Sequence, residues 1–202
     1  MRPIVKICGT TNLEDALICA HAGVNALGFI FYEKSPRRID PSKAAGIIKL
    51  LPSSVTPIGV FVNEKRETIE GIIRQTHIRG IQLSGDESPD ECDGFTVPTW
   101  KAFRIRDVKD VGQIKDYKVS AVMLDGSSDK EYGGSGKLAD FSVAIEMKRY
   151  NRIILSGGLS PENISDAIER VQPYGVDVNS GIEITPGKKN PSDVKLLFDQ
   201  LK

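Results

Sequence analysis

Short apolar runs and helix-like segments alternate along the whole chain, and this alternation constrains the fold more than any other feature. Each apolar run has the length of a buried strand and is followed by a helical or connecting segment, with clear helix starts at Asn12, Asp40-Pro41 and Asn190-Pro191. Such a pattern predicts a parallel sheet covered by helices. The expected strands are Ile4–Ile7, Ala26–Phe31, Pro57–Val62, Gly80–Leu83, Thr99–Ile105, Ala121–Leu124, Arg152–Leu155 and Gly175–Val178.

The length of the chain decides between a closed and an open sheet. The 202 residues contain no linker and no change in composition that would divide them. Eight strand–helix units in this length predict a single (β/α)8 TIM barrel, an α/β fold that spans residues 1–202 as one domain. The weakest units follow the fourth and fifth strands, where 86–98 leaves room for little more than one helical turn and 108–115 is a modest helix. A flavodoxin-like open sheet with extra elements is the alternative.

Charge and cysteine content exclude several classes of function. Lys plus Arg and Asp plus Glu are equal at 27 each, so the chain has no electrostatic footprint for nucleic acid or an anionic membrane. No apolar run approaches the roughly 20 residues of a membrane helix, and Met1-Arg2-Pro3 lacks the apolar core of a signal peptide. Cys8, Cys19 and Cys92 are odd in number and widely spaced, which favours a reducing cytoplasm over a disulfide framework or a zinc site.

In a barrel the active site lies at the carboxyl ends of the strands, where this chain carries reactive side chains. Cys8 follows the first strand and precedes a helix N-terminus, where exposed amides lower the pKa of a thiol; a small buried core cysteine is the alternative. Asp125 ends the sixth strand, where a carboxyl group can act as a general acid or base. Asp177 lies inside the eighth strand and is either a structural group or a substrate ligand. His21 and His77 both fall in helical patterns, so no His-centred triad or metal site is expected.

Two glycine-containing turns predict a phosphate site. Ser156-Gly157-Gly158 follows the seventh strand, and Asn179-Ser180-Gly181 follows the eighth. Glycine lets the backbone approach an anion and direct successive N–H groups at it, and barrels often bind phosphate with these two loops. The alternative is that Gly157 and Gly158 only form a tight turn before a helix opened by Ser160-Pro161.

Two further loops supply candidate ligand contacts. Arg37 and Arg38 follow the second strand, and the planar guanidinium of one of them can hold a carboxylate or phosphate, unless both are solvated. The glycine-rich run Gly133–Lys137 follows the sixth strand and lacks Walker spacing. It fits either a flap that closes over substrate or an ordinary loop.

Taken in order, these motifs resemble phosphoribosylanthranilate isomerase of tryptophan biosynthesis over nearly the whole chain. The most specific runs are Lys6–Gly9 and Asp177–Glu183; the others are 28–37, 59–63, 82–85, 124–125, 133–137 and 155–159. The resemblance implies a barrel without metal or organic cofactor. It also implies a small phosphorylated substrate, N-(5'-phosphoribosyl)anthranilate, which an Amadori rearrangement converts into the 1-deoxyribulose product. The sequence leaves monomer and homodimer open.

The resemblance also implies roles for particular residues. Cys8 matches the general base of the family and Asp125 its general acid. Arg37 matches the arginine that contacts substrate near the anthranilate, and Asp177 matches the aspartate of the eighth strand. One departure is Ser84, which stands where the family usually has histidine. The residues that match the phosphate loops are Gly157, Gly158, Ser180 and Gly181.

Two other functions compete with this one. Another phosphate-binding barrel enzyme, such as a sugar-phosphate epimerase or the related isomerase of the histidine pathway, typically uses two carboxylates or a metal, whereas the first strand here ends in Cys8. A non-catalytic sensor of a phosphorylated ligand would keep the glycine loops but would not need Cys8 and Asp125 together.

Overall fold

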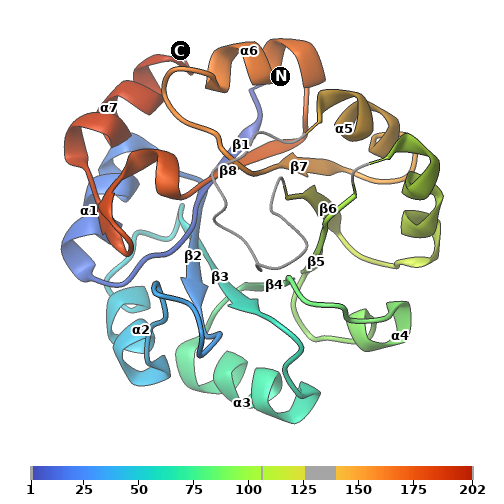
Figure 1. Cartoon of the computed structure of the whole chain (residues 1–202). Helices are drawn as coiled ribbons and strands as arrows, with labels where there is room; N and C mark the ends of the chain where they lie inside the picture. Colours follow the sequence, from blue (N-terminus) through green and yellow to red (C-terminus); the bar gives the residue numbers. More distant parts are fainter. Residues whose placement is uncertain (1, 106, 126–139, 202) are drawn as a thin grey trace.

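Eight parallel strands close into a barrel, with helices in a ring around it (Figure 1). The computed structural model describes residues 2–105, 107–125 and 140–201. The strands pair in chain order, and β1 also pairs with β8, so the predicted barrel is confirmed and the open-sheet alternative is wrong. The strands are β1 (Ile4–Ile7), β2 (Ala26–Ile30), β3 (Thr56–Phe61), β4 (Gly80–Leu83), β5 (Thr99–Phe103), β6 (Ala121–Leu124), β7 (Ile153–Leu155) and β8 (Gly175–Val178).

The helices begin where side-chain caps satisfy their first backbone amides. Asn12, Asp40 and Asn190 each accept a hydrogen bond from the first turn of the helix that follows, as predicted. The helix after β7 begins at Ile164 rather than at Ser160-Pro161, because residues 161–163 form a turn first. The helices are α1 (Leu13–Ala22), α2 (Pro41–Ile48), α3 (Arg66–Thr76), α4 (Pro89–Cys92), the 3-10 helix η1 (Val108–Asp116), α5 (Phe141–Met147), α6 (Ile164–Val171) and α7 (Pro191–Asp199).

The reduced unit after β4 is held by a buried ion pair in addition to its short helix. As predicted, α4 is a single turn of four residues. Lys101 of β5 donates to a carboxylate oxygen of Glu87 at 2.9 Å and to the carbonyl oxygen of Gly85 at 2.7 Å. Glu87 in turn accepts from the amide of Asn63 at 2.8 Å, so the pair ties the loops after β3 and β4 together.

The interior of the barrel changes from apolar to polar along the strand direction. Its apolar layer contains Ala26, Ile58, Trp100, Ala102, Ala121, Met123 and Ile154. Side chains alternate along a strand, so Lys6 and Cys8 share the inner face of β1. Cys8 packs with Ile30 and Val60 towards the carboxyl ends of the strands. The apolar layer fills the barrel, and the reactive groups therefore gather at the end where the loops leave the strands.

A hairpin that the sequence did not predict follows β8. After a 3-10 turn, η2 (Ser180–Ile182), the chain forms β9 (Glu183–Thr185) and β10 (Lys188–Lys189), which pair antiparallel. Gly187 makes the turn with a φ of +83°, and its carbonyl oxygen accepts from the Thr11 hydroxyl at 2.5 Å. The hairpin thereby brings Lys189 against the carboxyl end of β1. Within the described ranges, no helix has the length and apolarity needed to cross a membrane.

Candidate active site

A cavity of about 580 Å³ lies at the carboxyl ends of the strands. Of the eight predicted site residues, Gly181 is the one that does not line its wall. The fold thus brings together side chains that are up to 172 residues apart, from Cys8 to Ser180. The predicted residues that line the cavity are Cys8, Arg37, Asp125, Gly157, Gly158, Asp177 and Ser180.

The thiol of Cys8 lies beside a buried ion pair. Lys6 Nζ lies 2.8 Å from Asp177 Oδ1, and the two side chains are 0% and 5% exposed. The Lys6 ammonium also interacts electrostatically with the Cys8 thiol, and Ser156 lowers the pKa of Asp177. Gly28 of β2 leaves the space that this arrangement needs. A Cβ atom there would lie 2.7 Å from Cys8 Sγ and 3.1 Å from Lys6 Cε.

Burial and the neighbouring charges shift the pKa values of Lys6 and of the Cys8 thiol in opposite directions. Burial raises the pKa of the Cys8 thiol above its ordinary value, and the Lys6 ammonium opposes that rise. Burial is the largest influence on Lys6 and by itself would lower its pKa, but the Asp177 carboxylate and Cys8 together outweigh burial and raise that pKa. The raised pKa keeps Lys6 in its ammonium form next to the thiol, where it favours the thiolate against the effect of burial.

A second buried network lies on the other side of Cys8. Lys189 Nζ, which is 1% exposed, donates to the carbonyl oxygen of Cys8 at 2.6 Å, to Asn179 Oδ1 at 3.0 Å and to Glu183 Oε1 at 2.9 Å. Burial would raise the pKa of the Glu183 carboxyl, but Arg37 and Lys189 outweigh it and hold that pKa below its usual range. The network therefore ties the end of β1 to the β9–β10 hairpin.

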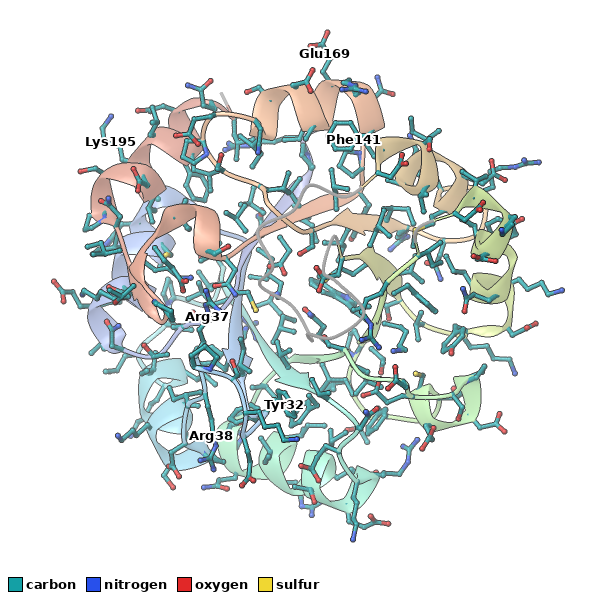
Figure 2. All side chains as sticks on the ribbon, viewed as in Figure 1. Tyr32, Arg37, Arg38, Phe141, Glu169 and Lys195 are labelled. Carbon is teal, nitrogen blue, oxygen red and sulfur yellow. The ribbon has the colours of Figure 1, made fainter. Side chains whose placement is uncertain are left out.

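Of the two adjacent arginines, Arg37 belongs to the site. Its Nε and Nη2 donate to Glu183 Oε2 at 2.9 Å and 2.7 Å, and no acceptor for its Nη1 occurs among the described residues. Arg38 is exposed, and its Nη2 lies 3.8 Å from Glu33 Oε1. Figure 2 shows Arg37 nearer the centre of the barrel than Arg38. Because Glu183 fixes one edge of the Arg37 guanidinium, the Nη1 edge remains for a ligand carboxylate.

The loop after β7 has the backbone form of an anion site. Gly157 and Gly158 have φ values of +90° and +63°, which place two successive residues in the left-handed region. Asn163 shapes the loop, since its Nδ2 donates to the carbonyl oxygen of Gly158 at 2.8 Å and its Oδ1 accepts from the Ser160 amide at 2.9 Å. Across the described ranges, the amides of Gly157 and Gly158 have no hydrogen-bond acceptor in the protein. They are donors available to an anion.

The loop after β8 packs closely on the loop after β7. A Cβ atom on Gly181 would overlap the carbonyl oxygen of Leu159, so the absence of a side chain permits the two loops to approach. Ser180 lines the cavity and Gly181 lies behind it. A direct phosphate contact from the Gly181 amide stays a prediction, whereas its packing against Leu159 is observed.

Asp125 lines the cavity at the end of β6, and its amide donates to the carbonyl oxygen of Phe103 at 3.0 Å. Its side chain is half-buried. The flap predicted for Gly133–Lys137 lies outside the described residues. Asp125 and Cys8 reach the cavity from β6 and β1, so a ligand there can meet both side chains.

Gln82 and Ser84 form the wall contributed by β4. Gln82 Nε2 donates to Ser84 Oγ at 3.0 Å. Gln82 is 6% exposed, and its Oε1 is the one buried side-chain nitrogen or oxygen in the described part of the chain with no hydrogen-bond partner. An unpaired buried oxygen at a cavity wall marks a position where a ligand donor would be stabilised.

Sequence reasoning gave no role to four residues of this site: Lys6, Gln82, Glu183 and Lys189. Lys6 did carry a signal, because lysine inside an apolar strand is seldom fully buried without a partner. Lys189 carried none, because its position depends on a hairpin that strand and helix periodicity did not predict. Among the described residues, no group of three or more His, Cys, Asp or Glu side chains is arranged to hold a metal ion.

Comparison with known proteins gives a consistent result. The family model described as N-(5'phosphoribosyl)anthranilate (PRA) isomerase matches residues 5–200. A curated relative from Trichlorobacter lovleyi, named N-(5'-phosphoribosyl)anthranilate isomerase, is 47% identical over 192 residues and covers 95% of this chain and 94% of its own.

Two solved structures are similar over 98% of this chain and 98% of their own. One, described as monomers generated from a dimeric phosphoribosylanthranilate isomerase of Thermotoga maritima, has 37% identity and a TM-score of 0.88. The other is a phosphoribosyl anthranilate isomerase in complex with reduced 1-(o-carboxyphenylamino)-1-deoxyribulose 5-phosphate, with 35% identity and a TM-score of 0.87.

Proposed function

The chain belongs to the N-(5'-phosphoribosyl)anthranilate isomerase family, and we propose that its cavity carries out the family reaction with Cys8 as general base and Asp125 as general acid. The protein is an isomerase of tryptophan biosynthesis that converts N-(5'-phosphoribosyl)anthranilate into 1-(2-carboxyphenylamino)-1-deoxyribulose 5-phosphate. The observation that supports these roles is the cavity itself, which Cys8 and Asp125 line from β1 and β6.

The substrate lies with its phosphate at the loops after β7 and β8 and its anthranilate towards Arg37. The Gly157 and Gly158 amides, which lack acceptors in the described structure, supply neutral donors to the phosphate. The Nη1 edge of Arg37 supplies a charged donor to the carboxylate. Ser180 adds a donor to the phosphate, and Asp177, which lines the wall between the loops and Cys8, contacts the sugar.

Ring opening is the first step. Asp125 in its protonated form delivers its proton to the furanose oxygen as the bond from C1′ to that oxygen breaks. The nitrogen lone pair forms the C1′=N double bond, so the intermediate is a protonated Schiff base and Asp125 becomes a carboxylate. General acid catalysis of this kind contributes about 10²- to 10⁴-fold in rate.

Removal of the C2′ proton is the second step. The Schiff base makes this proton acidic, and the Cys8 thiolate takes it. The electrons of the C–H bond form the C1′=C2′ double bond and the nitrogen becomes neutral, which gives the enol form of the product. The enol then loses its hydroxyl proton and gains one at C1′, so the conversion is an isomerisation with no net gain or loss of protons.

We also propose the setting in which the enzyme works. Residues 1–202 act as one domain, as a monomer or homodimer, on a small phosphorylated substrate and without a nucleic-acid or membrane partner. The three cysteines are free thiols, which suits the reducing cytoplasm. The balance of 27 basic and 27 acidic residues supports the absence of a polyanionic partner.

Turnover of freshly prepared phosphoribosylanthranilate, followed by its loss of fluorescence, tests this function. The purified wild-type protein is expected to consume this substrate and to leave the aminoaldose substrate of the histidine pathway unchanged. Binding of the product without turnover of the substrate would instead support a sensor, and turnover of the histidine-pathway substrate alone would support the related isomerase.

A further inference from the structure

We propose that Lys6 is a positioning residue for this reaction: its ammonium group, held by Asp177, stabilises and orients the Cys8 thiolate. The proposal rests on Cys8 being the base, as argued above. It assigns a role to the buried ion pair that binding and proton transfer at the substrate do not explain.

The arrangement of β1 and β8 places the three groups together. Lys6 and Asp177 are directly paired in the strand register, and their charged atoms are 2.8 Å apart. Cys8 is the next inner-face residue along the chain after Lys6, and its sulfur and Lys6 Cε border the same space beside Gly28. Lys6 Nζ donates to the Asp177 carboxylate, and the Cys8 thiol is the other group whose charge raises the pKa of Lys6.

The space around the sulfur is also made by the fold. Gly28 lies opposite on β2, and a Cβ atom there would come within 2.7 Å of Cys8 Sγ and 3.1 Å of Lys6 Cε. Any other residue at position 28 would push the thiol and the lysine from their present positions. The missing side chain at position 28 thus leaves the room that the Cys8 sulfur and the end of the Lys6 side chain occupy.

Stability alone gives a weak reason for this ion pair. Replacing a buried pair with apolar side chains of similar volume is often neutral or stabilising. Ile4, two residues before Lys6 on the same face of β1, packs against the apolar layer of the barrel, so an apolar pair would extend that layer. A fully buried lysine beside a nucleophilic sulfur is better explained by its effect on that sulfur.

Other charged groups lie around Cys8: Lys34, Arg37 and Asp125 line the cavity, and Lys189 and Glu183 lie beside the backbone of Cys8. Lys189 contacts the backbone oxygen of Cys8, not its sulfur, and its charge is matched by Glu183. Glu183 also neutralises Arg37. Lys6 is thus the cation in the described structure that most favours the Cys8 thiolate.

The pairing with Asp177 suits the change of charge at Cys8 during the reaction. Before C2′ deprotonation, Lys6 faces two anions, the thiolate and the Asp177 carboxylate. After the thiolate takes the proton, Lys6 keeps Asp177 as its counterion, so it remains an ammonium group and exchanges no proton itself. Asp177 therefore allows Lys6 to stabilise the thiolate without losing its own charge in the neutral state.

Alkylation of Cys8 by iodoacetamide across pH tests the proposal, because the thiolate is the reactive form. The modified peptide is quantified by mass spectrometry, and Cys19 and Cys92, whose pKa values burial raises to about 12, serve as slow internal references. Lys6→Met is expected to raise the alkylation midpoint by about one to three pH units. Asp177→Asn is expected to lower it, since it removes a negative charge.

Opposite shifts from two partners of one ion pair separate an electrostatic role from a structural one. A merely structural pair predicts shifts in the same direction, or none, and either result overturns the proposal. Because Lys6→Met leaves Asp177 buried without a counterion, the neutral double variant Lys6→Met/Asp177→Asn is measured as well. Its midpoint is expected above that of the wild type, and an unchanged midpoint in this variant also overturns the proposal.

The alkylation midpoint does not depend on turnover, so it is separable from the proposed function. If Cys8→Ser retains normal activity, the assignment of Cys8 as base fails whatever the midpoints show. If Cys8 is essential but Lys6→Met leaves the midpoint unchanged, the role of Lys6 alone fails. In support of that role, the turnover number of Lys6→Met should recover as the pH is raised towards its new midpoint.

Discussion

Glu183 joins the buried Lys189 to the partly buried Arg37, and its neutralisation by Glu183→Gln should destabilise the protein measurably. In the wild type, Glu183 accepts from Arg37 at 2.7 Å and 2.9 Å, from Lys189 at 2.9 Å and from the Gly187 amide at 3.1 Å. The variant keeps the size of the side chain but removes the only charge that this network offers to both cations. Lys189, at 1% exposed, is left with neutral acceptors alone: Asn179 Oδ1, the carbonyl oxygen of Cys8 and the new amide oxygen at position 183.

The expected loss lies at the lower end of the range for a broken buried pair. Removing one partner of such a pair costs about 3–5 kcal/mol. Arg37 is 12% exposed at the cavity wall and can gain water, and Lys189 keeps its neutral acceptors, so we expect a loss of about 3 kcal/mol. For a chain of this size, that loss corresponds to a fall in Tm of roughly 6–12 °C.

Urea and thermal unfolding at pH 7, followed by far-UV circular dichroism, measure this loss. Lys195→Gln is the matched control, because its i,i+4 pair with Asp199 leaves the lysine 79% exposed. Figure 2 shows Lys195 on the outer surface of the barrel. The control should lose no more than about 0.5 kcal/mol. A loss in Glu183→Gln no larger than the control would refute the reasoning.

The stabilisation by Glu183 should also depend on pH in a defined direction. The folded pKa of Glu183 lies below its ordinary value of 4.5, since Arg37 and Lys189 outweigh burial. The stabilisation is therefore fully present above pH 4.5 and is lost as the pH falls through the lower folded value. The difference between wild type and Glu183→Gln should shrink in acid. A difference that grows as the pH falls would contradict the assigned direction.

Three further substitutions separate chemistry from binding. Asp125→Asn should lower kcat much more than it weakens product binding, because Asn keeps hydrogen bonds but donates no acidic proton; a change in KM alone would point to a binding role. Gly158→Val should raise KM for substrate and Kd for product together in titrations, since position 158 has a φ of +63° and faces the expected phosphate; unchanged values would place the phosphate elsewhere. Gln82→Met should raise KM with the fold intact, because it removes the unpaired Oε1 at the cavity wall; an unchanged KM would show that no ligand donor meets this oxygen.

The barrel was predictable because each strand is a local apolar run. The bounds of β1, β4, β6 and β8 agree with the prediction; β2, β5 and β7 differ by one or two residues at one end, and β3 is shifted by one residue at both ends. Topology then determines the place of the site, because parallel strands put their carboxyl ends on one side. This is why Cys8, Asp125 and Ser180 could be assigned to one cavity from their positions in the sequence.

The parts that were not predictable depend on contacts between distant segments. Pro186-Gly187 is a recognisable turn signal, but nothing local indicates that the hairpin around it brings Lys189 to the end of β1. The packing of Gly181 against Leu159 was also not predictable, because this close approach appears only once the two loops are packed. The later start of α6 has a similar cause, since Asn163 bonds to Gly158 and Ser160 and so shapes the loop before the helix.

Steady-state turnover of phosphoribosylanthranilate by Cys8→Ser tests the central claim most directly. The hydroxyl keeps the shape of the thiol but has a far higher pKa, so kcat should fall by at least about a hundredfold while circular dichroism and product binding stay as in the wild type. Cys19→Ala is the control, because Cys19 is buried in α1 and does not line the cavity, and its kcat should stay close to wild type. A Cys8→Ser protein with near-normal kcat would contradict the account and return Cys8 to the role of a buried core thiol.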